Sequence, residues 1–502
     1  MTTVPGFVAV VVVTVTTLAI GTYGLRFSRT TSDFFVASRT VRPGLNASAI
    51  GGEYLSAASF LGVAGLLLTF GAEMLWYPIG WTAGYLVLLV LVAAPLRRSG
   101  AYTLPDFAEA RLASRHVRNL CSVLVVAIGW LYLLPQFEGA GLTLAAAIDA
   151  PRWVGPVVVG AVVLVNVGSG GMRSITFVQA FQYWLKLTAL LVPAAVLLVV
   201  WAGDEAVRSA GGPSATAGDW SVPLGGGGAQ GLYTTYSLVL ATFLGTMGLP
   251  HVVVRFYTNP DGRAARRTTL AVLALLGVFY VLPPVYAALG RAYGADPATS
   301  DSLVLDLPRL VVPGTLGDVL TGMVTAGAFA AFLSTSSGLA IAVSGVLTQD
   351  VTSRRLPGLG DLGDLAAFRV ATLAAVVVPL LATLALPDFG VARAVGLAFA
   401  VAASTFCPLL VLGIWWRGLT AAGAVAGLLV GGTGSVAAVA WTLAHDRAQG
   451  WFDVVVGQPA AWSVPLAFAT MVVVSRRTTA PAHARRFMVR LHTPETVELD
   501  RS

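Results

Sequence analysis

The sequence predicts an all-helical protein that crosses a membrane many times. Of its 502 residues, 56% are hydrophobic and only 11% are charged, and the mean hydropathy is +0.79. Such values are typical of integral membrane proteins and far from those of soluble domains. At about 20 apolar residues per crossing plus short connections, the chain is long enough for about thirteen spans. We therefore expect one polytopic bundle without a large soluble domain.

Apolar windows place these spans along the chain. They cover residues 4–25, 45–71, 74–96, 119–146, 153–170, 174–202, 231–256, 268–291, 315–348, 367–386, 391–414, 419–443 and 460–475. The first window has no positive charge before it and arginines after it, which is the reverse of a secretory signal peptide. It predicts a retained first helix with its N-terminus outside the cell.

The arginines predict the orientation of the bundle in the plasma membrane. With the N-terminus outside, the cytoplasmic segments hold Arg26, Arg29, Arg39, Arg42, Arg97, Arg98, Arg111, Arg115, Arg118, Arg255, Arg263, Arg266, Arg267, Arg354, Arg355, Arg369 and the tail from Arg476 to Arg501. The outer segments hold Arg152, Arg208, Arg291, Arg309, Arg393 and Arg447. This asymmetry follows the positive-inside rule and places the C-terminus in the cytoplasm. The net charge of +7 suits an anionic inner leaflet better than nucleic acid, which would require basic residues clustered on one domain.

The second window carries a charge inside an apolar stretch. Residues 50–62 read IGGEYLSAASFLG, so Glu53 follows Gly51 and Gly52. A carboxylate at membrane depth is costly unless it faces a partner or a water-filled cavity. Paired glycines weaken a helix and free backbone carbonyls that an ion can satisfy. The segment predicts a broken helix that binds a ligand, in which Glu53 either sets the field for a cation or caps N–H groups of the following half-helix.

A second interrupted window lies five spans later. In FLGTMGLPHVVVRF, residues 243–256, the helix would open at Gly245, Gly248 and Pro250. Interrupted helices at corresponding positions of two halves are typical of transporters built from inverted repeats, with the binding site at the midplane. We expect a single transmembrane domain over 1–502. Its parts are an extra helix and loop at 1–44, repeats at 45–202 and 231–414, C-terminal helices at 415–475 and a tail at 476–502.

A row of hydroxyl groups lies inside another apolar helix. Residues 323–345 include Ser334, Thr335, Ser336 and Ser337 in succession. Beside freed carbonyls, hydroxyl oxygens suit a hard monovalent cation such as Na⁺, whereas softer metals would call for His or Cys. An isolated pair would more simply bond back to its own helix carbonyls. Four in a row, in a chain with two interrupted helices, favour an ion site.

These motifs resemble the sodium:solute symporter family, and most of all its cation/acetate symporter branch. The matching stretches are SDFFVASR from Ser32, GEYLSAASFLG from Gly52, AYTLPDFAEARL from Ala101, GSGGMRSITFVQ from Gly168 and GTMGLPHVVVRF from Gly245. The resemblance implies the leucine-transporter (LeuT-like) fold, with five plus five inverted helices, one extra helix before them and two after. It also implies a Na⁺ site made by the carbonyls of Gly52, Leu55 and Ala331 and the hydroxyls of Ser334 and Thr335.

Two positions depart from the acetate branch or from its relatives. Acetate members often lack the hydroxyl pair, so Ser334 and Thr335 resemble the sodium-coupled sugar and proline members. Gln179 stands where those members carry an aspartate linked to sodium binding, and there the chain resembles the acetate branch. The resemblance implies a symporter that couples Na⁺ entry to uptake of a small monocarboxylate such as acetate. A proton-coupled carrier, a sodium-coupled carrier of another organic solute and a transporter-fold sensor remain alternatives.

Other polar residues in the apolar windows are candidates for coupling or substrate contact. Glu138 and Lys186, the only lysine in the chain, could form an ion pair, act as a proton relay or hold two helices together, and Lys186 could instead snorkel from its span. Gln136 could hydrogen-bond a carboxylate substrate. His251 could bind a proton or serve only in packing. The remaining candidates are Tyr54 and Gly248.

Enzymatic function is not expected from the sequence. It contains no HExxH, no Cys/His metal spacing and no nucleophile elbow, the patterns that would indicate hydrolytic or metal chemistry. Cys121 and Cys407 lie in separate apolar windows, so a disulfide framework is not expected either. The expected partners are a small organic anion, Na⁺ as coupling ion and the lipid bilayer, with no cofactor and no nucleic acid.

Overall fold

The computed structural model describes residues 4–24, 37–209, 220–222, 228–349, 364–385, 391–445, 450–481 and 483–497, and these contain helices but no strand. In chain order the helices are α1 (Val4–Gly24), η2 (Ala37–Arg39), α3 (Pro43–Tyr54), η3 (Ala58–Gly62), α4 (Val63–Phe70), η4 (Gly71–Leu75), α5 (Trp76–Val87), η5 (Leu88–Val92), α6 (Ala93–Arg98), α7 (Leu104–Leu112), α8 (Arg115–Ile148), α9 (Val154–Gly203), α10 (Glu205–Ser209), α12 (Gly228–Gly248), α13 (Pro250–Val254), η6 (Arg255–Thr258), α14 (Gly262–Phe279), α15 (Leu282–Ala292), η7 (Pro297–Ser302), α16 (Leu303–Val311), α17 (Thr315–Leu347), α19 (Asp364–Ala385), α20 (Val391–Trp415), α21 (Ala421–Ala444), α22 (Trp451–Gly457), α23 (Ala460–Arg476) and α24 (Ala484–His492).

The described residues contain ten helical stretches long and apolar enough to cross a membrane, or eleven if the bent pair of α22 and α23 counts as one. Two of these stretches, Ala58–Arg98 and Val154–Gly203, each take in parts of two windows predicted from the sequence. Gly71 interrupts the first with φ 79° and Gly171 the second with φ 58°. Glycine enters this left-handed region without a steric penalty. The described residues contain fewer spans than the thirteen predicted ones because each of these two stretches joins two predicted windows.

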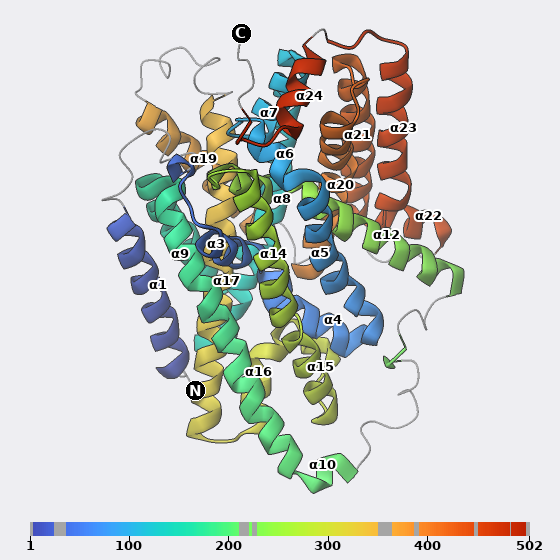
Figure 1. Cartoon of the computed structure of the whole chain (residues 1–502). Coiled ribbons are helices and arrows are strands. Elements are labelled where there is room, and N and C mark those ends of the chain that lie inside the picture. The colour runs from blue at the N-terminus through green and yellow to red at the C-terminus, as the bar shows by residue number, and fades with distance from the viewer. Residues whose placement is uncertain are drawn as a thin grey trace.

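Burial separates a central helix from peripheral ones. In α17, 94% of the most apolar window is buried within the protein, against 28% in α1. Figure 1 accordingly shows α17 inside the bundle and α1 at its left edge. Helices α9, α8, α3 and α1 pack against α17, while α12 packs against α20 and α5, and α21 against α23. The central position of α17 brings its hydroxyl row next to the first broken helix.

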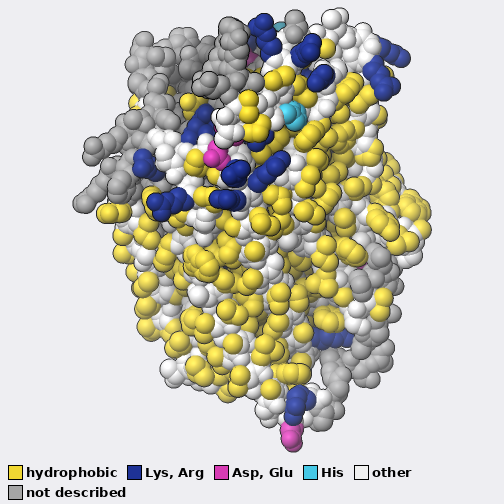
Figure 2. Space-filling model, viewed as in Figure 1, with side chains coloured by type: hydrophobic (Ala, Val, Ile, Leu, Met, Phe, Trp, Pro, Cys, Tyr) yellow, Lys and Arg dark blue, Asp and Glu magenta, His cyan; other side chains and the backbone are white. Residues whose placement is uncertain are grey.

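The surface has the pattern of a membrane-embedded bundle. Figure 2 shows hydrophobic side chains over the middle of one face and Lys and Arg side chains gathered toward the upper end, where the C-terminus lies in Figure 1. An apolar girdle with basic residues at one end is what a bilayer and the positive-inside bias require. The protein is therefore a multi-pass membrane protein.

The AYTLPDFAEARL motif builds a helix that ties the basic end together. Helix α7 begins at a capping box, in which Thr103 Oγ1 accepts from Asp106 N at 3.3 Å and Asp106 Oδ2 accepts from Thr103 N at 3.0 Å. Arg118 of α8 lies 2.8 Å from the Asp106 carboxylate. Arg111 is buried and donates to Gly413 O at 2.9 Å. This motif thus fastens α7 to α8 and α20.

Both interrupted windows contain a helix break, but the first break lies beyond its glycines. Helix α3 ends at Tyr54, and Leu55 leaves the helix with ψ 85°. Gly51 and Gly52 are helical, so the prediction that they open the helix was wrong. A Cβ on Gly52 would lie 2.1 Å from the backbone oxygen of Gln179, so this glycine permits close packing of α3 on α9. In the second window, α12 ends at Gly248 and Leu249 is extended with ψ 118°.

Candidate functional site

A fully buried ion pair joins the two broken helices. Arg255 Nε donates to Glu53 Oε2 at 2.6 Å, and the two side chains are 0% and 1% exposed. The other guanidinium nitrogens donate to Thr176 Oγ1 at 2.9 Å and to Gln179 Oε1, both on α9. Burying a charged pair is tolerable only when further hydrogen bonds satisfy it, and here the guanidinium has three polar acceptors on two helices.

The position of Arg255 corrects a prediction. The sequence placed it in a cytoplasmic segment because it ends an apolar window, whereas the structure buries it in η6. Glu53 also does not act as a cap, because the helix after the break has no side-chain cap hydrogen bond. Each interrupted motif carries one charged residue, and the two charges have opposite signs. This was the signal in the sequence for the ion pair, and it was missed. The contact of Arg255 with Thr176 was not predicted either.

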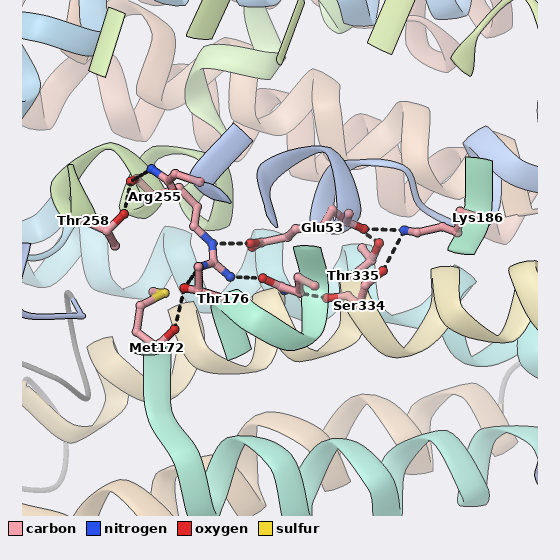
Figure 3. A network of polar contacts seen from close by, with 11 residues as sticks. Glu53, Met172, Thr176, Lys186, Arg255, Thr258, Ser334 and Thr335 are labelled. Carbon is pink, nitrogen blue, oxygen red and sulfur yellow. Dashed lines mark hydrogen bonds and ion pairs between the residues drawn. The ribbon is translucent and has the colours of Figure 1, made fainter. Parts of the chain in front are cut away.

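The amine of Lys186 lies among the groups that were predicted to bind Na⁺. Its Nζ donates to Gly52 O, to Leu55 O at 2.8 Å and to Ser334 Oγ at 2.8 Å. Figure 3 shows Arg255 and Lys186 approaching Glu53 from opposite sides. The side chain of Lys186 is fully buried. The structure therefore brings both halves of the predicted ligand set together, with a lysine between them.

These contacts overturn two predictions for Lys186. An ammonium has three N–H donors, and all three are used on Gly52, Leu55 and Ser334. None remains for Glu138, so the predicted pair or relay with Glu138 was wrong. Snorkelling was wrong as well, because the amine does not reach the membrane interface. A sequence gives no signal for a bond to a backbone carbonyl, which explains the error.

The other predicted ligands link α17 to the break. Thr335 Oγ1 donates to Glu53 O at 2.7 Å, and Ser334 Oγ donates to Ala331 O at 3.0 Å. Gln179 Nε2 donates to Ser334 O at 2.8 Å. The back-bond within α17 is the simpler alternative considered for an isolated hydroxyl pair, but Thr335 reaches across to α3. Carbonyls, hydroxyls and one amide thus link α3, α9 and α17 in one buried network of hydrogen bonds.

Gln136 is already bonded at the first break. Its Oε1 accepts from Ala57 N at 3.0 Å, and its Nε2 donates to Tyr132 O at 3.3 Å. Ala57 precedes the helix that resumes after the break, where N–H groups lack helical partners. In this structure the amide therefore completes the broken backbone, and a contact with substrate would have to compete with these two bonds.

An aromatic cluster lies between the two breaks. The Phe399 ring is 6.3 Å from Tyr54, 5.8 Å from Trp81 and 5.9 Å from Tyr132, measured between centroids. The Tyr132 ring lies 5.3 Å from that of His251. The hydroxyl of Tyr54 is bonded to Thr246 Oγ1 at 2.8 Å, across the break. Predicted candidates Tyr54 and His251 therefore share one apolar environment.

Three buried polar groups around this cluster have no hydrogen-bond partner in the described part of the chain. They are Trp81 Nε1, Tyr85 OH and both ring nitrogens of His251. Tyr85 joins the cluster through Tyr54, with ring centroids 4.9 Å apart. Buried donors without partners are costly.

Gly248, another predicted candidate, has a packing role. A Cβ at this position would lie 2.4 Å from Ala402 O and so would separate α12 from α20.

The sequence matches a known family over most of its length. The model of the sodium:solute symporter family covers residues 34–431. The chain belongs to this family. It is 32% identical over 429 residues to the uncharacterized symporter YwcA of Bacillus subtilis, covering 83% of this chain and 82% of the relative. It is also 32% identical over 504 residues to a monocarboxylic acid transporter of Corynebacterium glutamicum, covering 92% of this chain and 89% of that protein. This symporter is a transporter and not an enzyme.

Solved structures show the fold. A Na⁺-coupled sialic acid symporter in a substrate-bound outward-open state superposes with a TM-score of 0.72 at 15% identity, over 95% of this chain and 98% of the other. MhsT in complex with L-phenylalanine gives 0.57 at 15% identity, over 86% and 98% of the two chains. The nucleobase-cation-symport-1 transporter Mhp1 gives 0.54 at 12% identity, over 92% and 99%. The predicted leucine-transporter fold is confirmed.

Proposed function

We propose that this symporter takes up a small monocarboxylate, such as acetate, together with a cation. A carboxylate accepts several hydrogen bonds, and the unpartnered donors of Trp81, Tyr85 and His251 surround an aromatic cluster suited to a short apolar tail. This is the observation that carries the proposal. The monocarboxylic acid transporter at 32% identity supports the same substrate class.

The coupling ion has two candidates. Family membership and the fold shared with a Na⁺-coupled symporter support Na⁺, with Gly52, Leu55, Ala331, Ser334 and Thr335 as ligands. The proton is favoured by a different observation, which is the Lys186 amine bonded to three of those groups. In either case the bound cation would bridge α3 and α17 and hold one state of the alternating-access cycle through its different affinity for the two states.

The proposed direction of transport is inward across the plasma membrane. The dense basic end of the bundle in Figure 2 would face the cytoplasm under the positive-inside rule. That orientation puts the end of α24 inside the cell and the start of α1 outside. Glu53, buried against Arg255, would set the local field rather than ligate the ion.

Uptake of radiolabelled acetate into proteoliposomes tests the proposal. Concentrative uptake driven by either a Na⁺ or a proton gradient is expected, after subtraction of passive entry into protein-free liposomes. A panel of unlabelled monocarboxylates, amino acids and sugars should compete in that order of strength. Absence of gradient-driven acetate uptake, or inhibition of that uptake only by amino acids or sugars, would contradict the assigned substrate.

A further inference from the structure

The environment of the Lys186 amine is that of a bound monovalent cation. The amine is buried, and its three N–H groups donate to two carbonyls of α3, Gly52 and Leu55, and to the Ser334 hydroxyl of α17. These three oxygens are also three of the five that the family resemblance assigns to Na⁺. A tethered ammonium and a free ion therefore compete for one position.

Both cations cannot be held there at once. Na⁺ would need the same Gly52 and Leu55 oxygens that now lie at hydrogen-bond distance from the Lys186 nitrogen. Two like charges sharing these ligands would repel strongly, since the interior screens charge much less than water does. Na⁺ binding would also require all three lysine bonds to break inside the membrane, where the amine has no water to replace them.

We propose that Lys186 is a tethered cation that takes the place of Na⁺ at this site, so that the residues present do not fit the Na⁺ ion that the family resemblance assigns to them. This inference rests on the cation-coupled symport proposed above.

The charges around Lys186 fit a cation that is held at this position. Glu53 of α3 is the ionisable group that interacts electrostatically with Lys186, and Arg255 of η6 pairs with the same carboxylate from the other side. The neighbours on α17 are the neutral hydroxyls of Ser334 and Thr335. Helices α1, α8, α15, α16 and α19 also pack on α9, and within the described ranges none of them bonds an ionisable side chain to Lys186.

The three hydrogen bonds of the Lys186 amine join the broken helix α3 to α17. A Na⁺ ion on the same oxygens would bridge the same two helices, so the tethered ammonium replaces the ion in position and in charge.

The decisive experiment measures the Na⁺ dependence of the intact symporter, with acetate as the transported probe. In wild-type proteoliposomes a Na⁺ gradient at equal pH should change the rate of acetate uptake less than twofold. Radioactive ²²Na⁺ should not enter with acetate. Uptake that requires Na⁺, or acetate-dependent ²²Na⁺ entry, would overturn the proposal.

A variant gives a readout that is independent of transport. Removing the side chain in Lys186→Ala should open the oxygens to Na⁺, so that Na⁺, but not choline, raises the melting temperature of the variant in detergent. The wild type and the control Thr188→Ala, whose hydroxyl faces outward and bonds its own helix, should not respond. A Na⁺-dependent rise in the wild type would contradict the proposal even if Lys186→Ala fails to fold.

These experiments distinguish an error in the proposed substrate from an error in the proposed role of Lys186. If acetate is not transported at all, the wild type should still ignore Na⁺ in the melting assay while Lys186→Ala responds, which would reject the monocarboxylate and keep the tethered cation. If acetate uptake follows the Na⁺ gradient, the substrate stands and the role of Lys186 is rejected.

Discussion

The two helix breaks of this symporter differ in how their buried polar groups are bonded. At the first break, the charged groups of Glu53, Arg255 and Lys186 each have a charged or polar partner, although Glu53 Oε1 and Ser56 Oγ have none among the described residues. At the second, both ring nitrogens of His251 have none among the described residues. A bonded network in a low-dielectric interior fixes one arrangement, whereas an unpartnered donor remains costly until a ligand supplies an acceptor. The paired charges of the first break therefore hold one conformation, whereas the unpartnered ring of His251 suits the second break to receive a solute.

The largest effect is expected from breaking the ion pair at the first break. Arg255→Met leaves Glu53 buried without its cation, which should cost about 3–5 kcal/mol in the free energy of unfolding. The double variant Glu53→Met/Arg255→Met should recover much of this loss, because no charge is then left unpaired. Thermal unfolding of the wild type and the two variants in detergent measures the loss of stability and its recovery. A single variant as stable as the wild type would show that the network does not fix the conformation.

A smaller effect is expected from separating α3 and α9. Gly52→Ala puts a Cβ 2.1 Å from Gln179 O, which is backbone and cannot move aside, so overpacking should cost about 1–3 kcal/mol. Gly44→Ala is the matched control in the same helix, because a Cβ there meets nothing within 4 Å. Equal melting temperatures for the two variants would contradict the close packing of the first break.

The smallest effect on stability is expected around the second break, where the effect on uptake should be clear. Tyr85→Phe removes a hydroxyl that has no hydrogen-bond partner among the described residues, so stability should hardly change. Loss of a hydrogen bond to a carboxylate, about 1.5 kcal/mol, should raise the acetate concentration for half-maximal uptake about tenfold. In the control Tyr286→Phe the lost hydroxyl donates to Leu190 O at 3.1 Å, so stability should fall while uptake is retained. If Tyr85→Phe instead lowered stability and left acetate uptake unchanged, the substrate would not bind at Tyr85.

Much of the architecture could be predicted from the sequence, because hydrophobic windows and interrupted motifs are local signals. The helical bundle followed from the hydrophobic windows, whereas the leucine-transporter fold and the meeting of the first break with Ser334 and Thr335 were implied by the resemblance to the family. The prediction erred where the answer depended on side-chain reach. The partner of Glu53 is 202 residues away in sequence, and Arg255 looked like a loop residue because it ends an apolar window.

Two further errors have the same origin. Lys186 was paired with Glu138 because both are ionisable, whereas its acceptors include the carbonyls of Gly52 and Leu55, which every sequence position possesses. Gly52 was expected to open the helix through its flexibility. Its role is steric instead, since the neighbouring helix leaves no room for a Cβ, and such a contact becomes visible only when α3 and α9 are placed together.

The most direct test of this account is a high-resolution cryo-EM structure of the symporter in a buffer that contains both acetate and Na⁺. The account predicts density for a carboxylate among Trp81, Tyr85 and His251, with the Lys186 amine still bonded to the first break. Density for an ion on the carbonyls of Gly52 and Leu55, with the Lys186 side chain displaced, would contradict it.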